Sequence, residues 1–180
     1  MVLPTDTVYG IGTRPDDAAA TSRLFEAKRR PRDLELPVLI PSIDAARHVG
    51  RVDDRGRALM DAFWPGPLTI VLPRAEASLS WDLGGDPQTV GVRCPRHLMA
   101  RALLERTGPM AVTSANISGR QPPSTCDELV ETFGESVDVY LCQEEPLVGA
   151  ASTVVDLAHG EPAVVRRGAL SESDLRAALG

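Results

Sequence analysis

The segment that begins at Met110 and ends at Thr125 constrains the fold more than any other stretch of the chain. Its first residues, Met-Ala-Val, are apolar and suit a short buried strand. Gly119, Pro122 and Pro123 then oppose regular structure until Thr125, which suits the start of a helix. Because ligands bind at the carboxyl ends of strands in open α/β sheets, the segment predicts an α/β fold with a site at this strand end.

Ser114 and Asn116 are the residues of this segment with the strongest claim to bind a ligand. They are two positions apart, so both side chains share one face if the chain stays extended. A hydroxyl and a carboxamide can orient a phosphate, a ribose or an amino acid without adding charge. Ser and Asn also bond their own backbone in ordinary turns, so the spacing alone leaves both interpretations open.

A second polar segment follows the apolar amino-terminal residues Met-Val-Leu, which suit a buried strand. Thr5 and Thr7 flank Asp6 and share a face if the chain is extended. Gly10 and Gly12 then predict a loop that allows close approach of a ligand to the backbone. A β-turn after an edge strand is the alternative interpretation.

Four basic residues lie within five positions, at the end of a helix that we expect from residue 18 to about residue 29 after an Asp16 or Asp17 cap. They are Lys28, Arg29, Arg30 and Arg32. Such a cluster at an exposed helix end suits the binding of a triphosphate. Cations at a helix end also compensate the helix dipole, which is the simpler explanation.

The rest of the chain alternates between short apolar runs and helical segments. We expect strands in residues 37–40, 68–72, 89–93, 137–142, the last part of 148–156 and 162–168, helices in 42–49, 54–63, 96–107, 125–133 and from Ser171 onward, and a loop over 74–88. Leu98, Met99 and Leu103 are expected to face the core. We therefore predict one domain over residues 1–180, of α/β (α+β) class, with a twisted mixed sheet flanked by helices and a concave ligand site at strand ends.

Arg93 ends one of these strands, where its guanidinium suits a carboxylate with two oxygens. A surface salt bridge is the common alternative and contributes little to stability.

Composition narrows the possible functions. The net charge of −6 and the aromatic content of 4% argue against a broad nucleic-acid-binding face and against base-stacking platforms. Three cysteines without a CxxC pair indicate neither a disulfide framework nor a zinc site, so a reducing cytoplasm is expected. No apolar run approaches the length of a membrane span.

Several motifs recur in an order known from one family. They read Pro4-Thr5-Asp6-Thr7-Val8-Tyr9-Gly10, Lys28-x-Arg30-Pro31, Trp64-Pro65-Gly66-Pro67-Leu68-Thr69, Val92-Arg93, Ser114-Ala115-Asn116-x-Ser118-Gly119, Ser152-Thr153-Val154-Val155-Asp156 and Arg166-x-Gly168. Together they resemble the threonylcarbamoyl-AMP synthases, the YrdC-like family, over essentially the whole chain. The resemblance implies a nucleotidyltransferase that condenses L-threonine, bicarbonate and ATP into threonylcarbamoyl-AMP and pyrophosphate. It also implies Mg²⁺ on the ATP, a partner transferase that modifies tRNA, a cytoplasmic location and little or no stable tRNA binding.

The resemblance also implies roles for individual residues. The threonine-binding residues would be Thr7, Arg93, Ser114 and Ser152. The ATP-binding residues would be Lys28, Arg30, Thr89, Asn116, Ser124 and Arg166. Lys28, Arg30, Ser114 and Asn116 would be catalytic, and no residue is expected to bind a metal directly.

The chain departs from the family pattern in three places. The helix and full strand that usually precede the Pro-Thr motif are expected to be missing here. Residues 32–41 form a longer loop with Pro41 where relatives can carry a histidine, and residues 149–151 lack an acid that often precedes the Ser-Thr pair. Two other functions stay open, namely a non-catalytic RNA-binding or assembly module and a carbamoyl-handling relative with a different acceptor.

Overall fold

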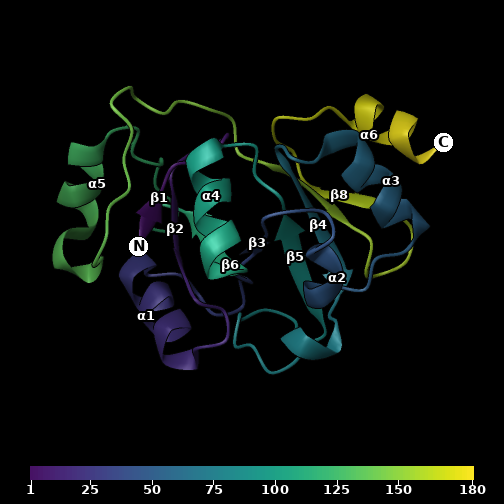
Figure 1. Ribbon diagram of the computed structural model, residues 1–180, viewed down its shortest axis with the longest axis horizontal. Coiled ribbons are helices and arrows are strands. Elements are labelled where there is room, and N and C mark those ends of the chain that lie inside the picture. Colours follow the sequence, from purple (N-terminus) through teal and green to yellow (C-terminus); the bar gives the residue numbers. More distant parts are fainter.

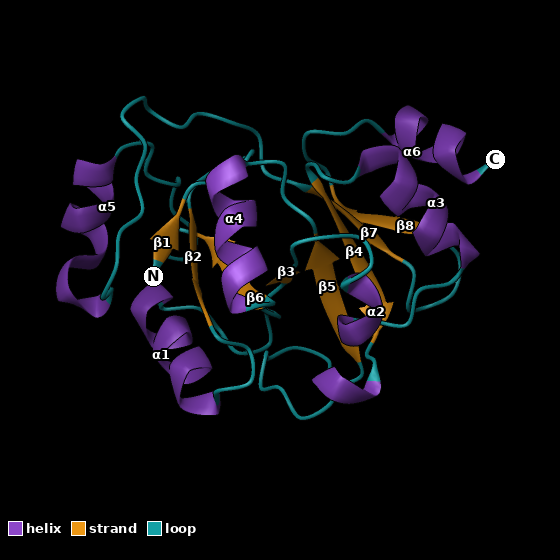
Figure 2. Ribbon diagram, in the orientation of Figure 1, coloured by secondary structure: helices purple, strands orange, loops and turns teal.

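The computed structural model describes residues 1–180 and contains one mixed sheet of eight strands in the order β1-β2-β6-β3-β5-β4-β7-β8 (Figure 1). The strands are β1 (Val2–Leu3), β2 (Gly10–Thr13), β3 (Val38–Leu39), β4 (Leu68–Pro73), β5 (Thr89–Arg93), β6 (Met110–Ser114), β7 (Thr153–Asp156) and β8 (Ala163–Arg166). The helices are α1 (Ala18–Lys28), α2 (Ala46–Val49), α3 (Asp54–Phe63), α4 (Leu98–Thr107), α5 (Cys126–Phe133) and α6 (Glu172–Leu179), with 3-10 turns at Glu76–Ser78 and Gly134–Ser136. The mixed sheet flanked by helices confirms the predicted fold class (Figure 2).

The two faces of the sheet are covered unequally. Alternate strand residues project to opposite faces, and the larger core cluster of 28 residues takes residues such as Val38, Ile70 and Val92 together with residues of α1, α2, α3, α5 and α6. On the opposite face, α4 packs over a cluster of only six buried residues. These are Leu3, Leu39, Ala100, Leu104, Met110 and Val112. Because one helix covers only part of this face, the rest of it is available for a ligand.

Two helices begin at predicted capping residues, whereas α2 begins at Ala46 without a side-chain cap rather than at residue 42. The Asp17 carboxylate accepts hydrogen bonds from the backbone of Ala19 and Ala20 at the start of α1. Thr125 and Glu128 form the predicted capping box at the start of α5. These contacts join residues two or three positions apart, so the sequence alone predicts them.

The structure corrects the expected orientation of α4. This helix begins at Leu98 rather than at residue 96, and its buried residues are Ala100 and Leu104. Leu98 is 82% exposed and Met99 39% exposed, whereas Leu103 is partly buried. Apolar residues occur nearly all around this helix, so packing against β1, β3 and β6 selects the inward face.

Two other expectations were wrong. Residues 137–142 form no strand, and only an isolated bridge joins Val2 to Tyr140. Gly10 and Gly12 lie in β2 rather than in a loop. A Cβ atom at either position would lie 2.6 Å from a side-chain carbon of Val112, so these glycines allow β2 to pack closely against β6.

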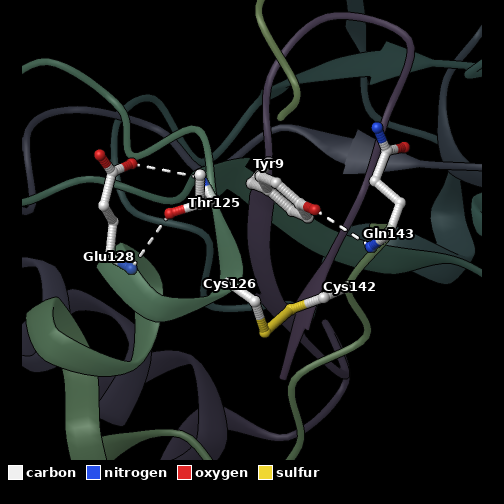
Figure 3. Close-up of a disulfide and its surroundings, with 6 residues drawn as sticks. All are labelled: Tyr9, Thr125, Cys126, Glu128, Cys142 and Gln143. Carbon is white, nitrogen blue, oxygen red and sulfur yellow. Dashed lines mark hydrogen bonds between the residues drawn. A yellow bond between two sulfur atoms is a disulfide. The ribbon is translucent and has the colours of Figure 1, made fainter. Parts of the chain in front are cut away.

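A disulfide joins Cys126 to Cys142, with Cα atoms 5.7 Å apart (Figure 3). It links the start of α5 to the segment after Tyr140, whereas Cys94 is free and buried. The sequence did not indicate this bond, because the two cysteines carry no spacing motif and meet only through the path of the chain. None of the α-helices combines the length and the apolar character that crossing a membrane requires.

Replacing Cys126 and Cys142 by Ser should lower the free energy of unfolding by about 3 kcal/mol, because the bond no longer constrains the unfolded chain. Urea unfolding without reductant measures this difference. Dithiothreitol should destabilise the parent protein to the same extent and leave the double variant unchanged. Equal unfolding midpoints for parent and variant without reductant would contradict the prediction.

Glu35 places a carboxyl group in a largely buried site between α1 and β3. Its Oε1 atom has no hydrogen-bond partner and lies 3.9 Å from the Arg74 guanidinium. Burial, only partly offset by Arg74, raises the pKa of Glu35 from 4.5 to about 8. The folded protein therefore holds a proton that the unfolded chain releases between these two pH values.

It follows that Glu35 stabilises the folded protein below pH 4.5 and that this contribution is lost as the pH rises toward 8. Glu35→Gln should remove the corresponding part of the decrease in unfolding free energy with pH, because Gln does not titrate. Urea unfolding at pH 5 and pH 8 compares the two proteins, with the exposed Glu131→Gln as control. If the unfolding free energy falls equally between pH 5 and pH 8 in the parent and Glu35→Gln proteins, Glu35 does not titrate in this way.

Candidate functional site

A cavity of about 360 Å³ lies on the sheet face that α4 leaves partly uncovered. Its floor includes Leu39 of β3, Thr69 of β4 and Val112 of β6. Its walls come from the segment before β2, residues 121–124 and residues 147–152. The predicted site residues that line it are Thr7, Arg93, Ser114, Asn116, Ser124, Ser152 and Arg166. Lys28, Arg30 and Thr89 do not line it.

Arg93, at the end of β5, is buried against the floor of the cavity and is 6% exposed. Its Nε–H donates to the Gly66 carbonyl at 3.0 Å, Nη1 donates to Thr7 Oγ1 at 2.9 Å and Nη2 donates to Asp6 Oδ1 at 2.7 Å. Burial lowers the pKa of Arg93, and Asp6 opposes that shift. The guanidinium is thus fixed by neighbours from two other segments.

Ser152 joins Arg166 to Thr69 in the lining of the cavity. Its Oγ accepts a hydrogen bond from Arg166 Nη2 at 2.8 Å and lies 2.9 Å from Thr69 Oγ1. Arg166 also donates through Nε and Nη2 to the Ser152 carbonyl. This arrangement leaves both N–H groups of Arg166 Nη1 without a protein acceptor.

Ser114 and Asn116 come together as their spacing suggested. Ser114 Oγ donates to Asn116 Oδ1 at 2.6 Å. The Asn116 amide nitrogen donates to the backbone carbonyls of Ile117 and Arg120. The pair is therefore held rigidly at the end of β6, on the wall of the cavity.

Lys28 lies beneath this pair rather than at an exposed helix end. Its Nζ donates to the carbonyls of Ser114 at 2.5 Å and Asn116 at 2.6 Å, and only 1% of Lys28 is exposed. Burial, with a smaller effect of Arg30, lowers the pKa of Lys28 to about 7. The expectation of an exposed Lys28 was wrong because the end of α1 packs against the turn that follows β6.

The other basic side chains of the cluster diverge. Arg30 donates to the carbonyls of Leu34 and Glu35, and its pKa is lowered by burial and by nearby Arg166. Arg32 pairs with Asp82 at 2.8 Å. Of these two arginines, Arg30 is thus the one whose charge lies close to a residue of the cavity, Arg166.

Thr89 begins β5, whereas Arg93 ends it, so the two residues are about 13 Å apart along the strand. The Thr89 carbonyl accepts a hydrogen bond from Arg74 Nε at 2.7 Å. Thr89 therefore lies outside the cavity, although the resemblance implied contact with ATP.

Sequence reasoning assigned no ligand role to several lining residues, among them Thr5 and Thr69. Thr5 Oγ1 lies 3.0 Å from Thr7 Oγ1, and Thr69 contacts Ser152 as described. Both carry a signal in the sequence, because Thr5 shares a face with Thr7 and Thr69 is a polar residue between apolar neighbours of a core strand.

Two covering segments border the cavity. The Leu147 N–H donates to the Ser124 carbonyl at 2.8 Å, which joins these two segments. Gly149 passes so close to Thr7 that a Cβ atom would lie 2.1 Å from the Thr7 carbonyl oxygen. Figure 3 shows the disulfide between Cys126 and Cys142, which ties together the chain next to both segments.

The charges around the cavity favour an anionic ligand. Burial lowers the pKa values of Arg30 and Arg93, and the nearby charge of Arg166 lowers both further. The residues that line the cavity include no carboxylate. No group of three or more His, Cys, Asp or Glu side chains is placed to hold a metal ion.

The Sua5_yciO_yrdC family model, described as "Telomere recombination", matches residues 1–168. A Mycobacterium tuberculosis protein (strain ATCC 25618 / H37Rv), provisionally named a threonylcarbamoyl-AMP synthase, is 43% identical over the whole chain, which covers 83% of it. The threonylcarbamoyl-AMP synthase of Pyrococcus abyssi is 36% identical over the whole chain, which covers 53% of that protein.

Solved structures agree with these matches. The crystal structure of P. abyssi Sua5 complexed with L-threonine superposes with a TM-score of 0.88 at 34% identity, over 99% of this chain and 53% of that one. The structure of Escherichia coli YciO gives a TM-score of 0.87 at 27% identity, over 97% of this chain and 85% of that one. The chain thus spans about half the length of the P. abyssi protein. Since the sequence match extends over most of the chain and the fold agrees, the chain belongs to the Sua5/YciO/YrdC family.

Proposed function

We propose that this chain is an L-threonylcarbamoyladenylate synthase, which converts L-threonine, bicarbonate and ATP to threonylcarbamoyl-AMP and pyrophosphate. The observation that carries the proposal is the convergence of Arg93, Thr7, Ser114 and Ser152 with Arg166 in one cavity. The names of the relatives and the P. abyssi Sua5 complex with L-threonine support it.

The amino-acid half of the cavity fits threonine. Arg93 has five N–H groups, of which three meet protein acceptors, so one remains on each terminal nitrogen. Two such N–H groups match the two oxygens of a carboxylate. The hydroxyls of Thr7, Ser114 and Ser152 line the same cavity and offer partners for the threonine hydroxyl.

The nucleotide half would extend from Asn116 and Ser124 to Arg166. The free Nη1 of Arg166 and the nearby charge of Arg30 suit the ATP phosphates. Lys28 stabilises this half of the site indirectly, because its ammonium donates to the backbone carbonyls of Ser114 and Asn116. We keep Thr89 only as a residue implied by the resemblance, because it lies outside the cavity.

The reaction needs no covalent nucleophile from the protein. The amine of threonine adds to bicarbonate with loss of water and gives a carbamate. A carbamate oxygen then forms a bond to the α-phosphorus of ATP, and the bond from that phosphorus to the bridging oxygen of pyrophosphate breaks. The arginines neutralise the charge of the reactants, and the fixed hydroxyls and amides orient them.

Magnesium, the partner and the location belong to the proposal as well. The lining residues include no carboxylate and do not fit a dedicated metal site, so Mg²⁺ would arrive on the phosphates and we derive no step through it. A transferase would receive the product and modify tRNA, while the net charge of −6 disfavours stable tRNA binding by this chain. We propose a cytoplasmic location, where the Cys126–Cys142 disulfide is an uncommon feature.

The direct test supplies ATP, bicarbonate and a single amino acid, and measures pyrophosphate and the adenylate product. L-Threonine should react best and L-serine less well, because serine loses only a methyl group worth about 1 kcal/mol of burial. L-Valine should react poorly, since it leaves hydroxyl-binding groups unpaired at about 1–3 kcal/mol each. Arg93→Ala should abolish the reaction with all three, whereas the exposed Arg47→Ala should retain parental activity. Pyrophosphate release that does not depend on the amino acid would reject the proposed function.

Arg30→Ala should weaken ATP binding about ten- to hundredfold, since a hydrogen bond to a charged group contributes about 1.5–3 kcal/mol. Isothermal titration with ATP measures the change, and thermal unfolding checks that the variant is folded. Arg29→Ala removes the same charge from the adjacent exposed position and serves as the control. Equal ATP affinity in Arg30→Ala and parent would assign Arg30 to the fold alone.

A further inference from the structure

Asp6 contacts the site but does not line the cavity. It stands between Thr5 and Thr7, and its side chain is 14% exposed. Its carboxylate Oδ1 accepts a hydrogen bond from Arg93 Nη2 at 2.7 Å. A largely buried carboxylate next to a buried guanidinium needs an explanation, because both groups lose hydration on folding.

The carboxylate of Asp6 is anchored independently of Arg93. The backbone N–H of Arg96 donates to the same Oδ1 atom at 2.9 Å. Arg96 follows β5 and also donates through its Nε to the Pro65 carbonyl. Asp6 is thus held by the segment that follows β5, and it presents a fixed negative charge to Arg93.

Three protein acceptors bind the Arg93 guanidinium, and Arg93 also lines the cavity. Gly66 accepts from Nε, Thr7 from Nη1 and Asp6 from Nη2. These three acceptors fix the plane of the guanidinium and use one N–H on each nitrogen. The remaining N–H of Nη1 and that of Nη2 are the groups that a ligand carboxylate can reach, since Arg93 lines the cavity.

The charge of Asp6 matters as well as its position. Burial disfavours the charged form of Arg93, and the nearby charge of Arg166 disfavours it further. Asp6 opposes both effects, and its hydrogen bond to Nη2 orients the guanidinium before any ligand arrives. A preorganised cation binds a carboxylate more tightly than one that must first be ordered.

We propose that Asp6 is a positioning residue for the amino-acid substrate, holding Arg93 so that two of its N–H groups receive the substrate carboxylate. This inference rests on the proposed function, because it takes L-threonine as the ligand of Arg93. The alternative is that Asp6 occupies the place of the ligand carboxylate and competes with it. The two arrangements predict opposite effects when the charge of Asp6 is removed.

The test compares the parent protein with Asp6→Asn, which keeps the size and one oxygen acceptor but removes the charge. Isothermal titration measures the binding of L-threonine, of L-threoninol and of ATP. L-Threoninol keeps the amine and the hydroxyl of threonine and lacks the carboxylate. We expect Asp6→Asn to raise the Kd of L-threonine tenfold or more, with the Kd values of L-threoninol and ATP changed less than twofold. The exposed Asp16→Asn serves as the matched control.

Each outcome separates the possibilities. Equal weakening of L-threonine and L-threoninol would mean that Asp6 only supports the fold, and tighter binding of L-threonine would mean that it competes with the ligand. Either result overturns the inference and leaves the proposed function intact if the parent forms the adenylate. A parent that binds no L-threonine would overturn both proposals. If Asp6→Asn does not fold, Asp6→Ser provides the same comparison with a smaller side chain.

Discussion

The burial of the Arg93 charge is the constraint on which the rest of the site depends. A guanidinium that loses its hydration costs several kcal/mol unless fixed acceptors surround it. Here those acceptors come from Asp6 and Thr7, which precede β2, and from Gly66, in the bend between α3 and β4. These segments are distant in the sequence, and movement of either one would leave an N–H group of the buried guanidinium without its acceptor. Arg93 at the end of β5 thereby holds the segment of Thr7, which lines the cavity.

The uneven cover of the sheet explains why there is room for a ligand at all. Five helices supply residues to the larger cluster, whereas α4 alone packs over the opposite face. The buried side chains of Ala100 and Leu104 pack in the smaller cluster and hold α4 against β1, β3 and β6. Beyond α4, the strand residues Thr69 and Arg93 face the cavity, and the segments around Ser124 and Leu147 border it.

The sequence predicted what depends on neighbours along the chain and missed what depends on distant contacts. The strand at 89–93, the helix at 54–63 and the Thr125 capping box need only a local pattern, and all three are confirmed. The burial of Lys28 requires the turn after β6, and the bond between Cys126 and Cys142 requires the path of the whole segment between them. Leu98 was assigned to the wrong face for the same reason, because only tertiary packing distinguishes the sides of an apolar helix. The resemblance to the family supplied seven of the residues that line the cavity, yet it assigned no role to Thr69, whose contact with Ser152 depends on the pairing of β4 with β7.

The two arginines that line the cavity follow one physical scheme. Arg166 uses its Nε and Nη2 groups on Ser152 and keeps Nη1 free, while Arg93 uses one N–H of each nitrogen and keeps two. Neither needs to break a protein hydrogen bond before it accepts an anion, so little reorganisation accompanies binding. Ser152 Oγ accepts from Arg166 and lies 2.9 Å from Thr69 Oγ1, so two neighbouring hydroxyls lie beside Arg166. A reaction that joins an amino-acid carbamate to a nucleotide requires both anions to approach one another. Cations fixed in advance in the cavity reduce the repulsion between these anions without a covalent step.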